Sequence, residues 1–207
     1  MAEQFYQYSD PDRITGAVDA LSAMTEHDRP FTRLVFSDEY KAARAWLQLQ
    51  FEEIGLECRT DAGGNLIGTR KATSIGEPPR KVIIGSHIDT VAAGGRFDGI
   101  AGVIAGLETV HYLNQHNINL PFDIEIIDFL GEELNVWGTS CLGSRHMAGL
   151  LNDDLLARKD QALLVRRDAL LVLDLGLDVL NRVRGLDLEG HGLAGESLHE
   201  DLHICRS

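Results

Sequence analysis

The chain has few cysteines, and they are too far apart to suggest a disulfide framework or a zinc-binding pair. Cys58, Cys141 and Cys205 are odd in number and include no Cys-x-x-Cys spacing. The sequence also lacks a run of about 18 apolar residues, which excludes a transmembrane helix. No basic segment followed by an apolar stretch stands at the N-terminus, so no secretory signal is visible. Together these absences predict a cytoplasmic protein with no membrane partner.

Basic residues are also scarce. The 207 residues include 19 Lys and Arg against 32 Asp and Glu, which gives a formal net charge of −13. Because proteins hold nucleic acids mainly through cationic contacts with phosphates, this balance argues against a nucleic-acid partner. The bulk composition, 44% apolar and 25% charged, is typical of a globular domain with a core of its own.

The order of the apolar patterns predicts an α/β fold with a mixed sheet flanked by helices. Helices are predicted at 10–25, 38–54, 100–113 and 139–149, and strands at 56–60, 65–69, 82–85 and 122–129. Asp10 and Ser37 are suitable N-caps, and Gly55 is suited to end the second helix. The first two strands should form a hairpin through residues 61–64. The continuous apolar run at 82–85 predicts a strand that is buried on both faces.

A histidine and several carboxylates follow these strands, beside glycines. His87 and Asp89 come after the strand at 82–85, and Glu132 and Glu133 come after the strand at 122–129. Asp98 lies between them in Gly94-Gly95-Arg96-Phe97-Asp98-Gly99. Active sites in such sheets lie beyond the carboxyl ends of the strands, so these groups are expected to converge. Imidazole and carboxylate groups are ligands for divalent metal ions, and a further carboxylate can accept a proton from water.

Each of these residues also has an ordinary structural interpretation. A lone histidine near a strand end is more often a hydrogen-bonded residue than a ligand. Asp89 could stabilise a turn, or it could accept the second imidazole N–H of His87 and so fix the tautomer that binds a metal. The acidic pair Glu132-Glu133 could simply be solvated on a loop. The metal-site hypothesis therefore depends on all of these residues taken together.

Taken together, the motifs resemble the dinuclear metallohydrolases of the M20 peptidase family. Within it they resemble the amidase branch of N-carbamoyl-L-amino-acid hydrolases, allantoate amidohydrolases and β-ureidopropionases. The resemblance covers about residues 10–150. The matching segments are Phe36-Ser37-Asp38-Glu39, Asp61-Ala62-Gly63-Gly64-Asn65-Leu66, Gly85-Ser86-His87-Ile88-Asp89-Thr90-Val91, Gly94-Gly95-Arg96-Phe97-Asp98-Gly99-Ile100-Ala101-Gly102-Val103, Glu132-Glu133 and Gly143-Ser144-Arg145.

The resemblance implies a site for two divalent metal ions, which could be zinc, manganese, cobalt or nickel. His87 would bind the first metal, Asp98 would bridge the two, and Glu133 would bind the second. Glu132 would be the general base, and Asp89 would orient His87. The implied reaction is hydrolysis of a linear amide or ureido C–N bond in a small molecule, such as an N-carbamoyl amino acid or allantoate.

The resemblance fades after about residue 156. Residues 1–156 are therefore interpreted as the N-terminal part of a metallohydrolase catalytic domain, and residues 157–207 as an unassigned leucine-rich tail. Near the end, Asp201-Leu202-His203-Ile204 resembles a family segment that supplies a further ligand of the first metal, so His203 is a candidate ligand. Family members are longer, and we expect this chain to be truncated or altered in its reading frame.

Two other interpretations remain open. The chain could be a catalytically incomplete fragment or remnant that keeps the fold, because some of the family's histidine ligands have no clear counterpart in it. It could also be a non-catalytic binding domain built on an M20-like core. The family's homodimer is expected only for a full-length form.

Overall fold

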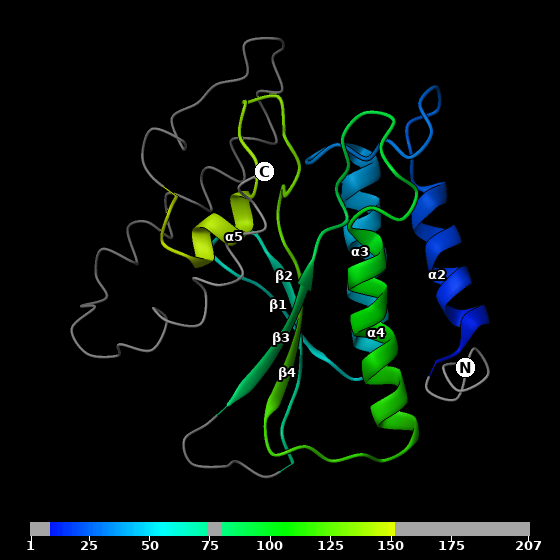
Figure 1. Cartoon of the computed structure of the whole chain (residues 1–207), viewed down its shortest axis with the longest axis vertical. Coiled ribbons are helices and arrows are strands. Elements are labelled where there is room, and N and C mark those ends of the chain that lie inside the picture. Colours follow the sequence, from blue (N-terminus) through cyan, green and yellow to red (C-terminus); the bar gives the residue numbers. More distant parts are fainter. Residues whose placement is uncertain (1–8, 74–79, 152–207) are drawn as a thin grey trace, which may run out of the picture.

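A computed structural model describes residues 9–73 and 80–151, which form a mixed sheet with helices on both sides (Figure 1). The helices are α2 (Pro11–Ala23), α3 (Asp38–Glu53), α4 (Ile100–Gln115) and α5 (Leu142–Met147), and the strands are β1 (Glu57–Thr60), β2 (Leu66–Arg70), β3 (Lys81–Ser86) and β4 (Asp123–Asp128). In Figure 1, α3 and α4 cover one face of the sheet, α2 packs outside α4, and α5 lies on the opposite side. The predicted fold class is confirmed.

The topology of the sheet decides which loops become neighbours. The strand order is β1-β2-β4-β3. As predicted, β1 and β2 form an antiparallel hairpin, and β2 is also antiparallel to β4. In contrast, β3 and β4 are parallel, and their last residues, Ser86 and Asp128, are paired in register. The loops that follow these two strands therefore start side by side at the same edge of the sheet.

The first helices begin and end as the sequence predicts. The Asp10 side chain accepts hydrogen bonds from the backbone N–H groups of Asp12 and Arg13, and the Ser37 hydroxyl accepts one from Tyr40. Gly55 follows α3 with a φ of 78°. The apolar faces of α2 and α3 enter one core with α4 and the sheet, and its largest fully buried members include Leu21, Tyr40, Leu47, Phe51, Ile100, Val103, Val110 and Ile126.

Small residues let α4 approach the sheet closely. A Cβ atom on Gly102 would lie 2.6 Å from the side chain of Ser86, and one on Gly106 would lie 3.0 Å from Cγ2 of Ile126. This close contact holds the start of α4, and the Asp98 loop before it, against the end of β3.

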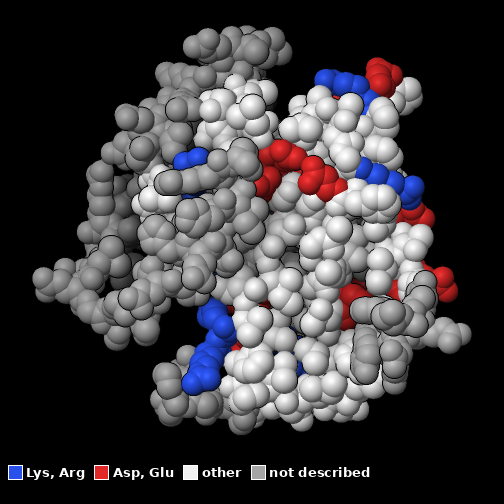
Figure 2. Space-filling view, viewed as in Figure 1, with Lys and Arg blue, Asp and Glu red and all other residues white. Residues whose placement is uncertain are grey.

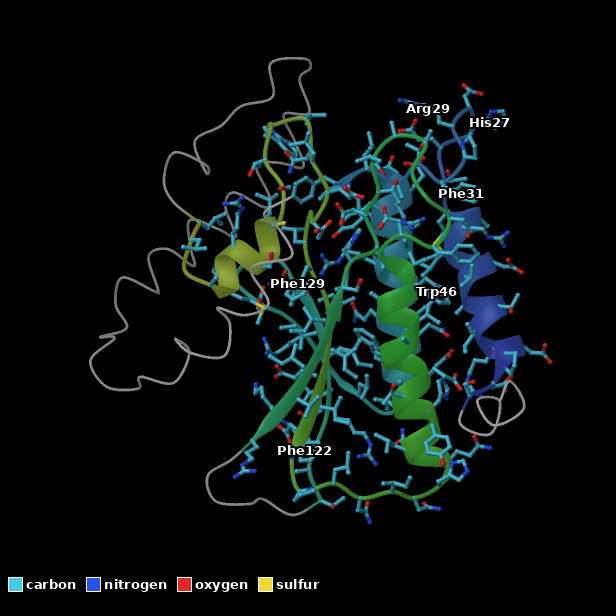
Figure 3. The ribbon with its side chains drawn as sticks, viewed as in Figure 1. His27, Arg29, Phe31, Trp46, Phe122 and Phe129 are labelled. Atoms are coloured by element: carbon cyan, nitrogen blue, oxygen red, sulfur yellow. The ribbon has the colours of Figure 1, made fainter. Side chains whose placement is uncertain are left out.

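The prediction that the strand at 82–85 is buried on both faces is wrong. Among the described strands, β3 pairs only with β4 and so forms an edge of the sheet. Val82 and Ile83 remain 43% and 46% exposed. Part of the second face is nevertheless covered at Gly85, where an added Cβ would lie 2.4 Å from the ring of Phe129. Figure 3 shows Phe122 and Phe129 at the two ends of β4. A continuous apolar run does not by itself distinguish an edge strand from a central one.

The helix predicted at 139–149 is shorter than expected. It starts only at Leu142, because Cys141 adopts a left-handed conformation with a φ of 56°. The residues before it form a turn instead, in which the N–H of Asn135 donates to the carbonyl of Thr139. The boundary predicted at residue 156 and the tail at 157–207 lie outside the described residues. Within the two described ranges, no helix has both the length and the apolar character needed to span a lipid bilayer.

Asn65 joins three segments near α5. Its side chain is fully buried, donates to the carbonyl of Gly143 at 3.1 Å and accepts from the N–H of Leu130 at 3.0 Å. Gly143 lies so close that an added Cβ would be 1.8 Å from Oδ1 of Asn65 and 2.6 Å from the nitrogen of Leu130. A side chain at position 143 therefore cannot fit without breaking this junction.

We predict that Gly143→Ala lowers the free energy of unfolding by about 1–3 kcal/mol, the usual cost of overpacking. Gly16→Ala is the matched control, because Gly16 lies in α2 with nothing within 4 Å of an added Cβ. That control should raise the free energy of unfolding by about 0.5–1 kcal/mol, since alanine favours a helix over glycine. Urea denaturation of both variants checks the prediction. Equal stabilities of the two variants would show that the junction tolerates a methyl group.

Candidate metal centre

The loop between β3 and α4, which carries His87 and Asp98, and the loop after β4 bring the predicted site residues together. Ligand atoms of His87, Glu132 and Glu133 all lie within 4.8 Å of one another. Nε2 of His87 is 3.4 Å from Oε2 of Glu132 and 3.9 Å from Oδ1 of Asp98. Four of the predicted residues, which come from two loops, therefore surround one point at the carboxyl edge of the sheet. The fourth predicted ligand, His203, lies outside the described residues.

The orientation of His87 suits a metal ligand. Its ring is largely buried, and Nδ1 lies 3.0 Å from the backbone oxygen of Asp89. Because a carbonyl oxygen can only accept a hydrogen bond, this contact assigns the proton of the neutral ring to Nδ1. The lone pair of Nε2 then faces the carboxylates of Glu132 and Asp98, where a divalent cation would bind.

Asp89 does more than the sequence suggested. Its carboxylate, 1% exposed, lies 3.5 Å from Nδ1 of His87, but its hydrogen bonds go to the loop after β4. Oδ1 accepts from the N–H of Glu132 at 3.2 Å, and Oδ2 accepts from the N–H of Glu133 at 3.1 Å. Asp89 thus ties the histidine loop to the acidic pair, a long-range contact with no signal in the sequence around it.

The charges at this point are unbalanced. Burial raises the pKa of Glu133 to about 7, and the adjacent Asp98 carboxyl adds to the rise. Burial alone would lower the pKa of His87, but the carboxylates of Asp89 and Glu132 raise it to about 9. One imidazole thus faces a cluster of carboxylates without a lysine or arginine in contact among the described residues. This donor set, with its surplus of negative charge, fits divalent metal ions.

Gly99 has a structural role that the sequence pattern does not reveal. Its φ is 67°, and an added Cβ would lie 2.4 Å from the carbonyl oxygen of His87 and 2.5 Å from its ring. Its own carbonyl accepts a hydrogen bond from the Ser86 hydroxyl at 2.7 Å. The glycine after Asp98 therefore lets the Asp98 loop approach the imidazole. The only signal in the sequence is the Asp-Gly pair itself.

Two buried charged residues beneath the site were also not predicted. Arg33 is 2% exposed and Asp128 is fully buried. Burial raises the pKa of Asp128 to about 7, although the positive charge of Arg44 opposes the rise. The signal for Asp128 is a carboxylate at the end of an apolar strand, where an uncompensated charge is costly. Arg33 has no comparable signal.

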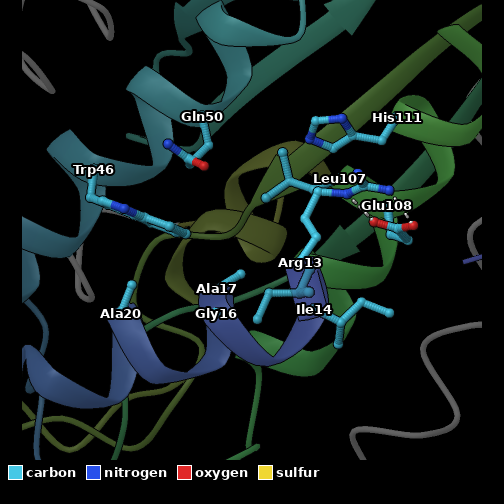
Figure 4. Close-up of a pocket in the computed structure, with 11 residues that line it drawn as sticks. Arg13, Ile14, Gly16, Ala17, Ala20, Trp46, Gln50, Leu107, Glu108 and His111 are labelled. Carbon is cyan, nitrogen blue, oxygen red and sulfur yellow. Dashed lines mark hydrogen bonds and ion pairs between the residues drawn. The ribbon is translucent and has the colours of Figure 1, made fainter. Parts of the chain in front are cut away.

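The cavity shown in Figure 4 is distinct from this cluster. It has a volume of about 290 Å³, lies between α2, α3 and α4, and includes none of the candidate ligands. Its guanidinium group, Arg13, is already paired with Glu108 at 2.7 Å. Figure 2, in contrast, shows acidic side chains gathered on the upper part of the viewed face, at the level of the loops after β3 and β4 in Figure 1.

Comparison with known proteins identifies the family. A model of peptidase family M28 matches residues 65–183, which is more than half of the chain. The chain belongs to peptidase family M28. M20 and M28 form one superfamily, so the predicted resemblance is confirmed at that level.

Named relatives match more than two thirds of the chain. The chain is 36% identical over 151 residues to the N-carbamoyl-L-amino-acid amidohydrolase of Pseudomonas sp. (strain NS671). The match covers 73% of this chain and 36% of that protein. The chain is also 34% identical over 143 residues to the ureidoglycolate hydrolase of Oryza sativa subsp. japonica, which covers 69% of this chain and 29% of that protein. The crystal structure of a hydantoinase/carbamoylase family amidase from Burkholderia ambifaria matches with a TM-score of 0.71 and 31% identity, over 84% of this chain and 41% of that one. The chain therefore spans about a third of the length of the curated relatives it matches.

Proposed function

We propose that this chain carries the metal-binding part of a hydrolase that cleaves a linear amide or ureido C–N bond in a small molecule. The observation that carries the proposal is the convergence of His87, Glu132 and Glu133 within 4.8 Å. The substrate class is supported by the relatives, which are named for N-carbamoyl-L-amino acids and ureidoglycolate. N-carbamoyl amino acids and related ureido acids such as allantoate are therefore the substrates to test first.

Two divalent ions would occupy the cluster. His87 would hold the first, Asp98 would bridge both, and Glu133 would hold the second, with His203 as a further candidate for the first. When bound, such ions polarise the substrate carbonyl and make water acidic enough to react near neutral pH. Zinc, manganese, cobalt and nickel all suit a set of one imidazole and several carboxylates.

The protein's own residues would supply proton transfer and alignment. Glu132 would take a proton from the attacking water and return it to the leaving nitrogen. Its side chain is 33% exposed and adjoins His87 Nε2, so substrate and water can reach it. Asp89 would keep Glu132 and Glu133 in place through its two hydrogen bonds to their N–H groups.

A catalytically incomplete form is the second candidate. The observation in its favour is that the chain spans only 36% and 29% of the two relatives named above. Such a form would keep the metal cluster but lack groups that bind or orient the substrate. The two candidates differ in turnover and agree in metal binding, so an experiment has to measure both quantities.

We predict that the 207-residue chain binds cobalt and that chelation removes it. Asp98→Ala should weaken cobalt binding, since it removes the proposed bridge, while the exposed Asp28→Asn should not. Cobalt absorption spectra measure binding, and ammonia release from N-carbamoyl amino acids, allantoate and ureidoglycolate measures turnover. Turnover that requires metal supports the hydrolase, and binding without turnover supports the incomplete form. A chain that binds no metal, or hydrolyses these compounds fully in excess chelator, would contradict both.

A further inference from the structure

The backbone of Ile88, between His87 and Asp89, is held at both its N–H and its carbonyl by buried charged side chains. Its N–H donates to Oδ1 of Asp128 at 3.0 Å. Its carbonyl accepts from Nε of Arg33 at 2.6 Å. These two groups belong to successive peptide units, so neither of the peptide units that flank Ile88 can rotate without breaking a buried, charge-assisted hydrogen bond.

Arg33 is itself firmly anchored. Its Nη1 donates to the carbonyl oxygens of Leu21 and Met24 at the end of α2, at 2.7 and 3.0 Å. Its backbone pairs with Thr90: the N–H of Arg33 donates to the Thr90 hydroxyl, and the N–H of Thr90 donates to the Arg33 carbonyl. Arg33 therefore fixes the histidine loop on both sides of Asp89.

Asp128 connects the other strand to the same loop. It is the last residue of β4, so it also directly precedes the loop that carries Glu132 and Glu133. Its Oδ2 has no hydrogen bond and faces Nε of Arg44 at 3.6 Å, while Arg44 donates to the hydroxyl of Tyr40. The buried pair of Asp128 and Arg44 is weak evidence of a stabilising role, because apolar side chains of similar volume often give a protein the same or greater stability.

We propose that Asp128 and Arg33 are positioning residues that clamp the backbone of Ile88 on its two sides. His87 and Asp89 flank Ile88, so rotation of the two peptide units beside Ile88 would turn the imidazole away from Glu132 and pull the Asp89 carboxylate from the N–H groups of Glu132 and Glu133. The inference rests on the proposed function, because the clamp would serve to keep the metal ligands aligned. The alignment itself is a property of the metal-free chain.

The experiment measures two properties in the 207-residue chain. Amide hydrogen exchange is followed at Ile88, Glu132 and Glu133 without metal, and cobalt affinity is followed by absorption. The first variant is Asp128→Ala, and Asp128→Asn is the conservative rescue because it keeps an acceptor oxygen. Asp123→Ala is the matched control: Asp123 starts the same strand and accepts from the N–H of Ala72 at 2.7 Å, away from the site.

A further variant separates positioning from stability. Tyr40→Phe, Arg44→Met and Asp128→Leu together replace the buried polar network by apolar side chains, a change that often preserves stability. It leaves the Ile88 N–H without its acceptor all the same. This triple variant keeps the test decisive if Asp128→Ala does not fold.

We expect Asp128→Ala and the triple variant to exchange roughly tenfold faster at Ile88, Glu132 and Glu133. Cobalt affinity should fall roughly 10- to 100-fold. Asp128→Asn and Asp123→Ala should stay near wild type in both measurements. Faster exchange at Ile88 alone, with Glu132 and Glu133 unchanged, would overturn the clamp. A wild-type chain that binds no cobalt would refute the metal centre instead, and the exchange data would still decide the clamp.

Discussion

Replacing Glu132 by glutamine is expected to lower turnover by about 10²- to 10⁴-fold, the usual contribution of a general base. The amide keeps the size of the side chain but cannot take a proton from water. His87, Asp98 and Glu133 remain as the proposed ligands, so metal content should stay near wild type. The measurement is kcat for ammonia release together with bound metal per chain, in whichever length of the protein turns over substrate.

Glu133→Gln is the matched control, because it makes the same chemical change one residue away. It should lose metal as well as turnover, since it weakens a proposed ligand. Two outcomes would contradict the assignment of roles. One is a Glu132→Gln variant that keeps full activity, and the other is a pair of variants that lose metal to the same extent.

Replacing Gly99 by alanine is expected to cause the largest loss of stability among single substitutions at the site. The backbone conformation costs a non-glycine residue about 1–3 kcal/mol. The methyl group would also collide with the His87 carbonyl and ring, at 2.4 and 2.5 Å, and such overpacking costs about 1–3 kcal/mol. The free energy of unfolding should fall by the sum of these effects, and cobalt affinity should fall because the imidazole has to move.

Gly55→Ala isolates the contribution of the collision. Gly55 also has a positive φ, 78°, but an added Cβ there meets nothing within 4 Å. It should show only the backbone cost and no change in cobalt affinity. Urea denaturation and cobalt titration of both variants check this. Equal losses of stability, with cobalt affinity unchanged in both, would mean that Gly99 does not constrain His87.

Much of the fold could be predicted because its signals are local. Asp10 and Ser37 cap helices through bonds to residues two or three positions away, and the apolar face of α3 repeats with the period of a helix. The β1–β2 hairpin follows from a short glycine-containing turn. The convergence of His87 with Glu132 was also expected, since polar groups after the strands of such a sheet meet at one edge.

Other features depend on contacts that no local pattern contains. Among the described strands, β3 lies at the edge of the sheet and leaves Val82 and Ile83 exposed, and the late start of α5 follows from the left-handed Cys141. A run of apolar residues looks the same in an edge strand and in a central one. The residue type at position 141 likewise does not predict its left-handed φ angle. For that reason the predicted burial of the strand at 82–85 was wrong, and the helix predicted at 139–149 is present but shorter than expected.

The sequence by itself determined the inventory of the site: an imidazole, four carboxylates and the glycines beside them, in loops that follow strands. The tertiary structure decided what each group touches. Parallel pairing of β3 with β4 puts Asp128 beneath Ile88 and Asp89 beside the N–H groups of Glu132 and Glu133. Arg33 reaches the same loop from a segment 55 residues away from Ile88. The residue types and their spacing are local properties of the sequence. The hydrogen-bond partners of a buried charged side chain are not, because they form only when the topology brings distant backbone groups within hydrogen-bonding distance.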